Sequence, residues 1–288
     1  MRYKIIHETE YTYSIPVTIS QHLIHLEPIN CERQKWLQHS IEVFPSPAYQ
    51  NSREDIYGNK VTAFSIEDEH KIFKVTARGI VDVFDNSIPK KNIEWEKVKY
   101  RLKNPKNEED IKASMFMFES PLVSFDDAIK NYAMESFKPQ RDYIESLKDL
   151  NHRIYEDFKY SPGSTKIGTM PSEILRERKG VCQDFAHFMI ACLRSLGLSC
   201  AYISGYLHTR KKGEQQFLGA DATHAWVSVY IPNEGYFELD PTNDCIAGEE
   251  HIVVGKGRDF GDVSPLKGVI TGGGSPILKV AVNVEQTE

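Results

Sequence analysis

The spacing of apolar residues changes along this chain of 288 residues, and that change limits the folds open to it. Apolar and polar side chains alternate in five short runs, at 4–13, 17–26, 35–44, 60–66 and 72–84. Proline, glycine and asparagine residues between the runs mark turns. Alternating runs at this spacing are typical of antiparallel β-structure. We therefore predict a β-sandwich-like domain over residues 1–100.

The middle of the chain has a helical pattern instead. Residues 101–138 begin with a charged stretch and are predicted to form a connecting segment. Apolar side chains then recur every three or four residues over 143–158 and 181–196, which predicts two helices. Asp142 is a candidate cap for the first helix, and Gly197 is a candidate terminator for the second.

Strands are predicted after the second helix, at 199–207, 223–231 and 236–240. The last two are separated by Pro-Asn-Glu-Gly, a turn composition that predicts a hairpin. A glycine-rich stretch and a β-like run at 277–284 complete the chain. This order predicts an α+β core over residues 139–288, with the final run as a C-terminal β tail.

The composition argues against several classes of protein. The chain has 35 basic and 41 acidic residues, and its net charge of −6 disfavours nucleic acid or an anionic membrane as a partner. No apolar run approaches the roughly 18 residues that a membrane span requires, and no secretory signal is visible, so we expect a cytoplasmic location. Five cysteines without a CxxC pair suggest neither a disulfide scaffold nor a zinc site. No phosphate-binding glycine motif is present, and we expect no metal and no organic cofactor.

Cys182 is the first candidate for chemistry. It follows Gly180-Val181 and opens the second helical pattern. The unpaired N–H groups and the dipole at a helix N-terminus favour a thiolate, which is the nucleophilic form of cysteine. The alternative is a small buried side chain without chemistry. We prefer that alternative for Cys192 and Cys200, which lie among apolar neighbours.

A thiolate nucleophile requires a base and a group that orients the base. His224 and Asp240 occupy the two strands of the predicted hairpin, on the side opposite the apolar residues, so they share one face whatever the register. They could form an imidazole–carboxylate pair, or they could be a surface pair without function. Asp221 and Asp244 are rival acids. Asp184 lies in the first helical turn, where capping is its expected role.

Three motifs, taken together, resemble the transglutaminase-like superfamily: Gly-Val-Cys-Gln-Asp-Phe-Ala at 180–186, Thr-His-Ala-Trp-Val at 223–227 and Leu-Asp-Pro-Thr-Asn at 239–243. Residues 2–7 (Arg-Tyr-Lys-Ile-Ile-His) and 26–28 (Leu-Glu-Pro) are similar to the β-domain that precedes the core in a bacterial branch. Members of that branch are described as transglutaminase-like cysteine proteases. The chain departs from many of them at Tyr236 and His25, where they often carry Trp and Arg.

The resemblance implies a papain-like core in which a nucleophile helix packs on an antiparallel sheet. It also implies that Cys182 attacks an amide, that His224 transfers the proton and that Asp240 orients His224. The backbone N–H of Cys182 is a candidate oxyanion donor, and Trp226 is either a shield for the pair or a plain core aromatic.

Three outcomes remain open for this chemistry. A thioester on Cys182 could pass to water, as in a cysteine peptidase or amidase, and the resemblance favours this outcome. It could instead pass to a lysine amine, as in a protein-glutamine crosslinking transglutaminase. The fold could also serve as a catalytically silent peptide-binding module. The expected partner is a peptide or protein substrate, and the sequence leaves the oligomeric state open.

Overall fold

The structure is a computed structural model that describes residues 1–84, 89, 93–208 and 223–287. Its first half contains five strands: β1 (Arg2–Glu27), β2 (Gln34–Phe44), β3 (Tyr49–Glu54), β4 (Lys60–Ile66) and β5 (His70–Val83). They belong to one seven-stranded sheet in the order β2-β5-β1-β4-β3, and two C-terminal strands also pair with β1. All pairings in this sheet are antiparallel.

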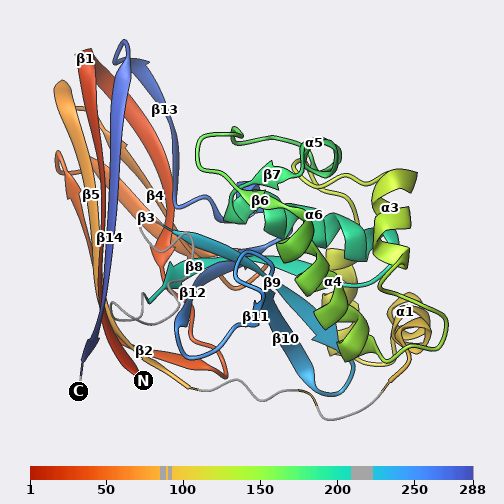
Figure 1. Cartoon of the computed structure of the whole chain (residues 1–288). Coiled ribbons are helices and arrows are strands. Elements are labelled where there is room, and N and C mark those ends of the chain that lie inside the picture. Colours follow the sequence, from red (N-terminus) through yellow and green to blue (C-terminus); the bar gives the residue numbers. More distant parts are fainter. Residues whose placement is uncertain (85–88, 90–92, 209–222, 288) are drawn as a thin grey trace.

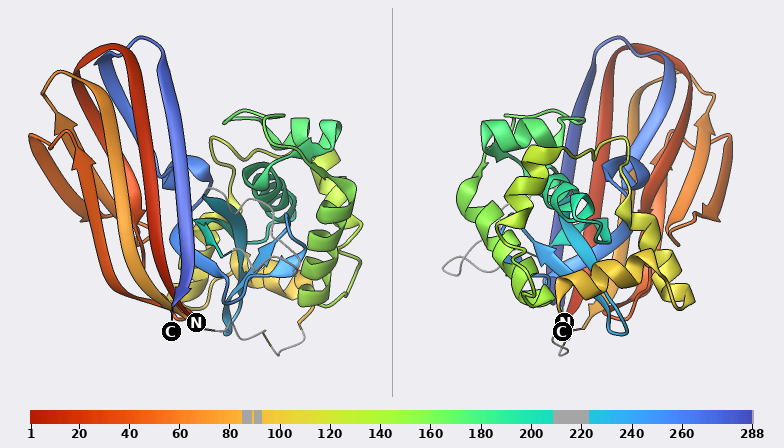
Figure 2. Two further views of the ribbon diagram at one scale, coloured as in Figure 1. Left: turned by 60° about the vertical axis from the view of Figure 1, so that its left-hand side comes forward. Right: turned by 90° about the vertical axis from the view of Figure 1, so that its right-hand side faces the viewer.

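The bend in β1 curls this sheet into two layers. Residues 2–12 of β1 pair with β5, whereas residues 20–27 pair with β4. The layers are visible side by side in Figure 1 and Figure 2. Buried side chains such as Tyr13, Phe64 and Phe73 form the apolar cluster of this region. The predicted β-sandwich-like N-terminal domain is therefore present as one curled sheet.

The C-terminal strands β13 (Leu266–Gly272) and β14 (Pro276–Thr287) complete this curled sheet. β13 pairs with the second half of β1, and β14 pairs with its first half from Tyr13 to Arg2. The sequence pattern predicts this tail as part of the core, and the structure differs on that point. The physical reason is that an alternating run identifies a strand without identifying the strand that pairs with it.

The core sheet has the order β11-β10-β9-β8-β12. Its strands are β8 (Cys200–Leu207), β9 (His224–Ile231), β10 (Gly235–Asp240), β11 (Cys245–Ile246) and β12 (His251–Gly257). The helices are α1 (Trp95–Lys103), α2 (Glu108–Ser114), η1 (Met115–Met117), α3 (Asp127–Met134), α4 (Tyr143–Asp157), α5 (Pro171–Glu177), α6 (Cys182–Ser195) and α7 (Phe260–Val263). β6 (Lys159–Tyr160) and β7 (Lys179–Gly180) form a short parallel pair.

Local signals place the two main helices as the sequence predicts. The Asp142 side chain accepts a hydrogen bond from the N–H of Glu145 at 3.0 Å and caps α4. Gly197 follows α6 with φ of +78°, a left-handed conformation that glycine adopts without steric cost. The apolar side of α6 packs on Val227 and Val229 of β9 in the main core cluster.

The curled sheet and the core share a buried apolar contact. Tyr3 and Val81 of the curled sheet belong to one cluster with Tyr206 and Ile252 of the core. The Tyr206 hydroxyl is also 3.0 Å from Nδ1 of His7. The observed architecture confirms the predicted α+β class, with a β-rich region beside a core in which a helix packs on an antiparallel sheet (Figure 2).

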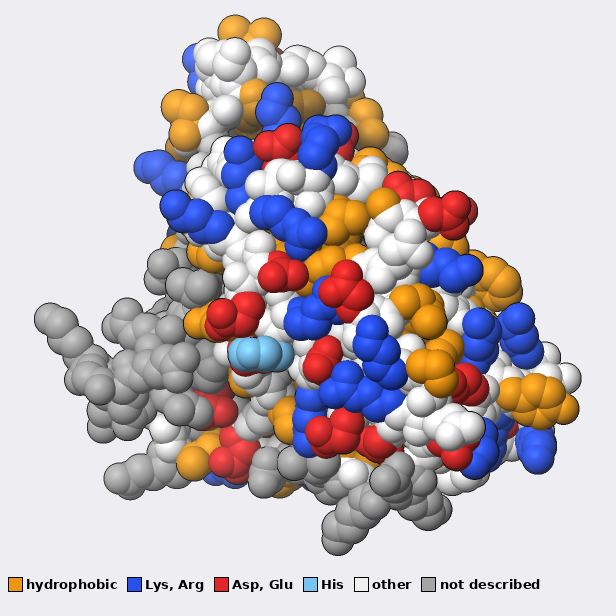
Figure 3. Space-filling model, turned by 45° about the vertical axis from the view of Figure 1, so that its right-hand side comes forward, with side chains coloured by type: hydrophobic (Ala, Val, Ile, Leu, Met, Phe, Trp, Pro, Cys, Tyr) orange, Lys and Arg blue, Asp and Glu red, His pale blue; other side chains and the backbone are white. Residues whose placement is uncertain are grey.

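The outer face of the helical core carries mixed charge. Basic and acidic side chains are interspersed on the face shown in Figure 3. Ion pairs of the core include Arg153–Glu135 and Arg141–Asp149. Among the described residues, no helix combines the length and the apolar character that crossing a membrane requires. The cytoplasmic location and the absence of a nucleic-acid partner stay predictions.

Candidate active site

Cys182 is the first residue of α6, and its side chain is almost completely buried. Val181 precedes it in an extended conformation, so the chain turns into the helix at the thiol. A Cβ on Gly180 would lie 2.8 Å from the Cβ of Asp184, which explains the glycine at the end of β7. This geometry exposes the thiol to the N-terminal amides of α6, as the sequence predicts.

The side chain of Asp184 caps the N-terminus of α6. Its Oδ2 accepts hydrogen bonds from the N–H of Val181 at 2.8 Å and from the Thr165 hydroxyl at 2.6 Å. Burial raises the pKa of Asp184, although these two hydrogen bonds act in the opposite direction. The expected capping role of Asp184 is confirmed, and its carboxylate is committed to the helix N-terminus.

His224 and Asp240 form a hydrogen-bonded pair. Nε2 of His224 lies 2.8 Å from Oδ2 of Asp240, and both side chains are fully buried. Leu239 of β10 pairs with Val227 of β9, so Asp240 lies diagonally across from His224. The shared face predicted from the hairpin is therefore observed.

Asp240 accepts further hydrogen bonds that hold it in place. Its Oδ2 also accepts from Nδ2 of Asn243 at 2.7 Å and from Nε2 of His251 at 3.2 Å. Its Oδ1 accepts from the N–H of Thr242 at 2.9 Å. Burial alone would raise the pKa of Asp240, but the charge and hydrogen bond of His224, with those of His251, hold it well below its usual range. The carboxylate is therefore ionised at neutral pH.

His251, which begins β12, belongs to none of the motifs that indicate the site. Its Nδ1 lies 3.3 Å from the N–H of Gly248 and accepts that hydrogen bond, so the ring proton is on Nε2. Burial lowers the pKa of His251, which is consistent with a neutral ring that donates to Asp240. No short motif contains both His251 and Asp240, and spacing alone could not have found this contact.

The second ring nitrogen of His224 is the one available to Cys182. Nδ1 of His224 is buried and has no hydrogen-bond partner among the described residues. Burial alone would lower the pKa of His224, but Asp240, followed by the nearby thiol of Cys182, raises it to about 10. These neighbours favour an imidazolium, which is the natural partner of a thiolate.

The rival residues of the sequence analysis lie elsewhere. Asp244 contacts α4, with its Oδ2 2.7 Å from Nδ1 of His152 and its Oδ1 3.1 Å from Nδ2 of Asn151. Asp221 lies outside the described residues. Burial raises the pKa of Cys192, and it raises that of Cys200 to about 12, so both thiols are protonated as expected of structural cysteines.

Trp226 packs against the imidazole of His224. Its ring lies 6.0 Å from the ring of His224 at an interplanar angle of 26°, and it is fully buried. It also belongs to a small apolar cluster with Ile203 and Val253. Trp226 is thus a core aromatic that packs on His224, and its role as a shield of the pair from water stays a prediction.

One group of side chains has the composition of a metal site. The ligand atoms of His224, Asp240 and His251 all lie within 4.8 Å of one another, and two histidines with one carboxylate can bind divalent metals. In this arrangement each Nε2 instead donates its proton to Oδ2 of Asp240. A metal would have to displace both protons, and the expected absence of a metal stays a prediction.

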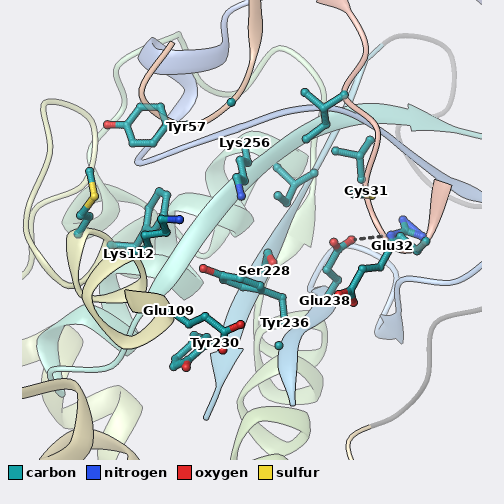
Figure 4. Close-up of a pocket in the computed structure, with 18 of the residues that line it drawn as sticks. Cys31, Glu32, Tyr57, Glu109, Lys112, Ser228, Tyr230, Tyr236, Glu238 and Lys256 are labelled. Carbon is teal, nitrogen blue, oxygen red and sulfur yellow. Dashed lines mark ion pairs between the residues drawn. The ribbon is translucent and has the colours of Figure 1, made fainter. Parts of the chain in front are cut away.

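A separate cavity of about 590 Å³ lies between the β1–β2 connection and the core sheet (Figure 4). Tyr236 forms part of its wall, and Nζ of Lys256 lies 5.6 Å from the centre of that ring. Ser228 and Glu238 also line the cavity, whereas Cys182 and the His224–Asp240 pair do not. The cavity is therefore distinct from the candidate active site.

A thiol at a helix N-terminus, beside a buried imidazole–carboxylate pair on an antiparallel sheet, is the arrangement of papain-like and transglutaminase-like folds. The crystal structure of a candidate cysteine protease from Cytophaga hutchinsonii has the same fold, with a TM-score of 0.77 at 20% identity. The match covers 100% of this chain and 92% of that one.

Sequence relatives give the family. Residues 3–82 match the bacterial transglutaminase-like N-terminal region, and residues 130–241 match the transglutaminase-like superfamily. An uncharacterised protein of Mycobacterium tuberculosis is 41% identical over 297 residues, which cover 98% of this chain and 92% of that protein. A protein-glutamine gamma-glutamyltransferase of Pseudomonas aeruginosa is 26% identical over 141 residues, which cover 45% of this chain and 21% of that enzyme.

The chain belongs to the transglutaminase-like superfamily, with the N-terminal region of its bacterial branch. This confirms the family that the sequence motifs indicated. At this level the family supports thiol-dependent acyl transfer as the class of chemistry.

Proposed function

We propose that the chain is a cysteine peptidase or amidase that acts on peptide or protein amides through Cys182, His224 and Asp240. The observation that carries the proposal is the buried 2.8 Å pair of His224 and Asp240, which leaves Nδ1 of His224 for the thiol at the start of α6. In this proposal Cys182 is the nucleophile, His224 is the acid and base, and Asp240 is the carboxylate that orients His224.

The first half-reaction forms a thioester. The thiolate of Cys182 attacks the amide carbon, and a C–S bond forms while the carbonyl oxygen takes the electron pair. We assign the stabilisation of that oxyanion to the N–H of Cys182, at the start of α6. Nδ1–H of His224 then protonates the departing amine, the C–N bond breaks and the imidazole becomes neutral.

The second half-reaction releases the acyl group. Nδ1 of His224 takes a proton from water, and the oxygen attacks the thioester carbon. The C–S bond breaks, so the products are a carboxylic acid and the regenerated thiolate–imidazolium pair. Ionised Asp240 stabilises the imidazolium in both half-reactions through the Nε2–H hydrogen bond.

Amine transfer is the second candidate function. It shares the first half-reaction, but a lysine amine replaces water in the second. The similarity to a protein-glutamine gamma-glutamyltransferase over 141 residues favours this candidate. A catalytically silent peptide-binding module is the third candidate, and the intact set of three side chains counts against it.

The discriminating experiment combines two assays on glutamine-containing peptides: release of ammonia or new termini, and incorporation of a primary amine. We expect hydrolysis to dominate and Cys182→Ala to abolish it, with the exposed Cys31→Ala as a matched control that retains it. Incorporation that exceeds hydrolysis at modest amine concentration would establish a transglutaminase instead. Failure of Cys182 to form an adduct with an acyl-directed thiol probe would leave the binding module.

A further inference from the structure

Arg33 is a buried cation that the N-terminal region contributes to the core. It lies in the connection between β1 and β2, and only 7% of its side chain is exposed. Its Nη1 donates to the carbonyl of Gly248 at 3.0 Å, and its Nη2 donates to the carbonyl of His251. The guanidinium therefore binds the first and the last residue of the turn, 248–251, that leads into β12.

The third nitrogen of Arg33 reaches β10. Its Nε lies 3.2 Å from Oε2 of Glu238, an ion pair drawn as a dashed line in Figure 4. The same Oε2 accepts a hydrogen bond from Nε1 of Trp226 at 2.8 Å. Trp226 in turn packs against His224 and has its ring 5.2 Å from that of His251.

Two routes thus lead from Arg33 to the His224–Asp240 pair. One passes through the turn at His251, whose ring donates to Asp240. The other passes through Glu238 and Trp226, whose ring lies against His224. The neighbouring Gln34 also binds β12. Its Nε2 donates to the carbonyl of Val253 at 2.6 Å, and its Oε1 accepts from the N–H of Val253 at 2.8 Å.

An arginine is costly to bury. Here Nη1 and Nη2 donate to two backbone carbonyls, whereas Nε makes no hydrogen bond and lies in an ion pair with Glu238. A planar guanidinium offers a fixed fork of donors, so it defines the positions of several acceptors at once. A lysine ammonium at the same place has one nitrogen and cannot span two carbonyls and a carboxylate. Displacing a reacting group by about 1 Å can cost a hundredfold in rate. Small shifts of the groups that Arg33 contacts could therefore change the rate of reaction at Cys182.

We infer that Arg33 is a positioning residue of the active site, which aligns His224 and Asp240 through the His251 turn and the Glu238–Trp226 contact. The inference rests on the proposed function and deepens it. It gives the N-terminal region a role in catalysis, because that region supplies the guanidinium. Arg33 itself touches neither substrate nor the thiol in this role.

The test measures iodoacetamide alkylation of Cys182 in the full chain from pH 5 to 9, with modified sites mapped by mass spectrometry. Cys192 and Cys200 are fully buried, so their protection reports in the same experiment that a variant is folded. The variants are Arg33→Met, Arg33→Lys and the double variant Arg33→Met with Glu238→Gln. The double variant leaves no unpaired buried charge, and its Gln carbonyl can still accept from Trp226. Arg78→Met, which removes an exposed ion pair with Glu42, is the matched control.

We expect the double variant to alkylate Cys182 roughly tenfold to a hundredfold more slowly at pH 6, while Cys192 and Cys200 stay protected. Arg33→Lys should recover only part of the rate, and Arg78→Met should match the wild type. Unchanged alkylation of Cys182 in the folded double variant would overturn the inference. Exposure of all three cysteines in the double variant would also overturn it, since Arg33 would then act on folding alone.

The wild-type chain separates this inference from the proposed function. If native Cys182 reacts no faster at pH 6 than the same thiol in the urea-unfolded chain, the proposed function fails and this inference falls with it. If native Cys182 is activated and all Arg33 variants are equally activated, the inference alone fails.

Discussion

His251 donates its Nε2–H to the same oxygen of Asp240 that receives Nε2 of His224, at 3.2 Å and 2.8 Å respectively. The two imidazoles have opposite electrostatic environments. Asp240 and Cys182 raise the pKa of His224 to about 10 against the effect of burial, whereas burial lowers the pKa of His251. One carboxylate therefore serves a ring that carries charge and a ring that stays neutral. The neutral ring can orient Asp240 without competing for its charge.

Asp240→Asn should impair the thiol more than it perturbs the fold. The amide keeps the size of the side chain but loses the charge that stabilises an imidazolium at His224. An amide NH2 would also face Nε2–H of His224 in one of its two orientations. We expect turnover and Cys182 alkylation at pH 6 to fall by about 10² to 10⁴. Asp244→Asn, at a carboxylate that contacts His152, should leave both rates unchanged.

The His224–Asp240 pair should give stability a defined pH dependence. The folded pKa of His224 is about 10, above its ordinary value of 6.5, so its stabilising contribution is complete below about pH 6.5 and is lost as pH rises through 10. The folded pKa of Asp240 is depressed, so its contribution is complete above about pH 4 and is lost at lower pH. The pair should therefore stabilise most between about pH 4 and 6.5.

Urea denaturation of the wild type and of His224→Gln measures this dependence. The difference in the free energy of unfolding should shrink from pH 6.5 to 10, at up to about 1.4 kcal/mol per pH unit. A difference is needed because burial also raises the pKa values of Cys192 and Cys200, so these thiols reduce the free energy of unfolding as pH rises above about 8.5. A difference that stays constant across this range would contradict the raised pKa of His224.

The sequence predicts the parts of the site that depend on local pattern. Cys182 follows from a glycine and an apolar residue before a helical run, and the His224–Asp240 face follows from alternation in a two-stranded hairpin. Neither argument requires knowledge of the whole fold. His224 and Asp240 could be placed on one face of the hairpin because the turn between its two strands is short.

The remaining parts depend on contacts between distant segments. Arg33 and His251 are 218 positions apart, and no periodicity connects them. β14 follows an alternating pattern, but its pairing with β1 is set by tertiary structure. The sequence does not predict β3, because its six residues, Tyr49–Glu54, are all exposed and show no alternation. Predicted separate runs at 4–13 and 17–26 are one bent strand, β1.

Removal of the cap at the N-terminus of α6 tests whether Asp184 acts on the helix alone. Asp184→Ala removes the acceptor of the Val181 N–H and Thr165 hydroxyl bonds, and should lower the free energy of unfolding by about 1 kcal/mol. Asp142→Ala removes the corresponding cap of α4 and should cost a similar amount. Only Asp184→Ala should also change Cys182 alkylation. Loss of a negative charge in the first turn of α6 favours the thiolate over the thiol, so alkylation at pH 6 should become faster.

Gly205→Ala should disturb the packing of Trp226 and β12 against the imidazole of His224. Gly205 pairs with His224 in the sheet, and a Cβ there would overlap the carbonyl oxygen of Ile252 and the ring of Trp226. The backbone oxygen of β12 cannot move aside cheaply, so overpacking should cost roughly 1–3 kcal/mol of stability. Displacement of Trp226 should also slow Cys182 alkylation in the folded protein. Gly248→Ala is the control, because its new Cβ would meet only Glu250 and Ile246 at 3.6 Å or more. Equal stability and equal alkylation in the two variants would show that β8 and β12 are not packed as closely as described.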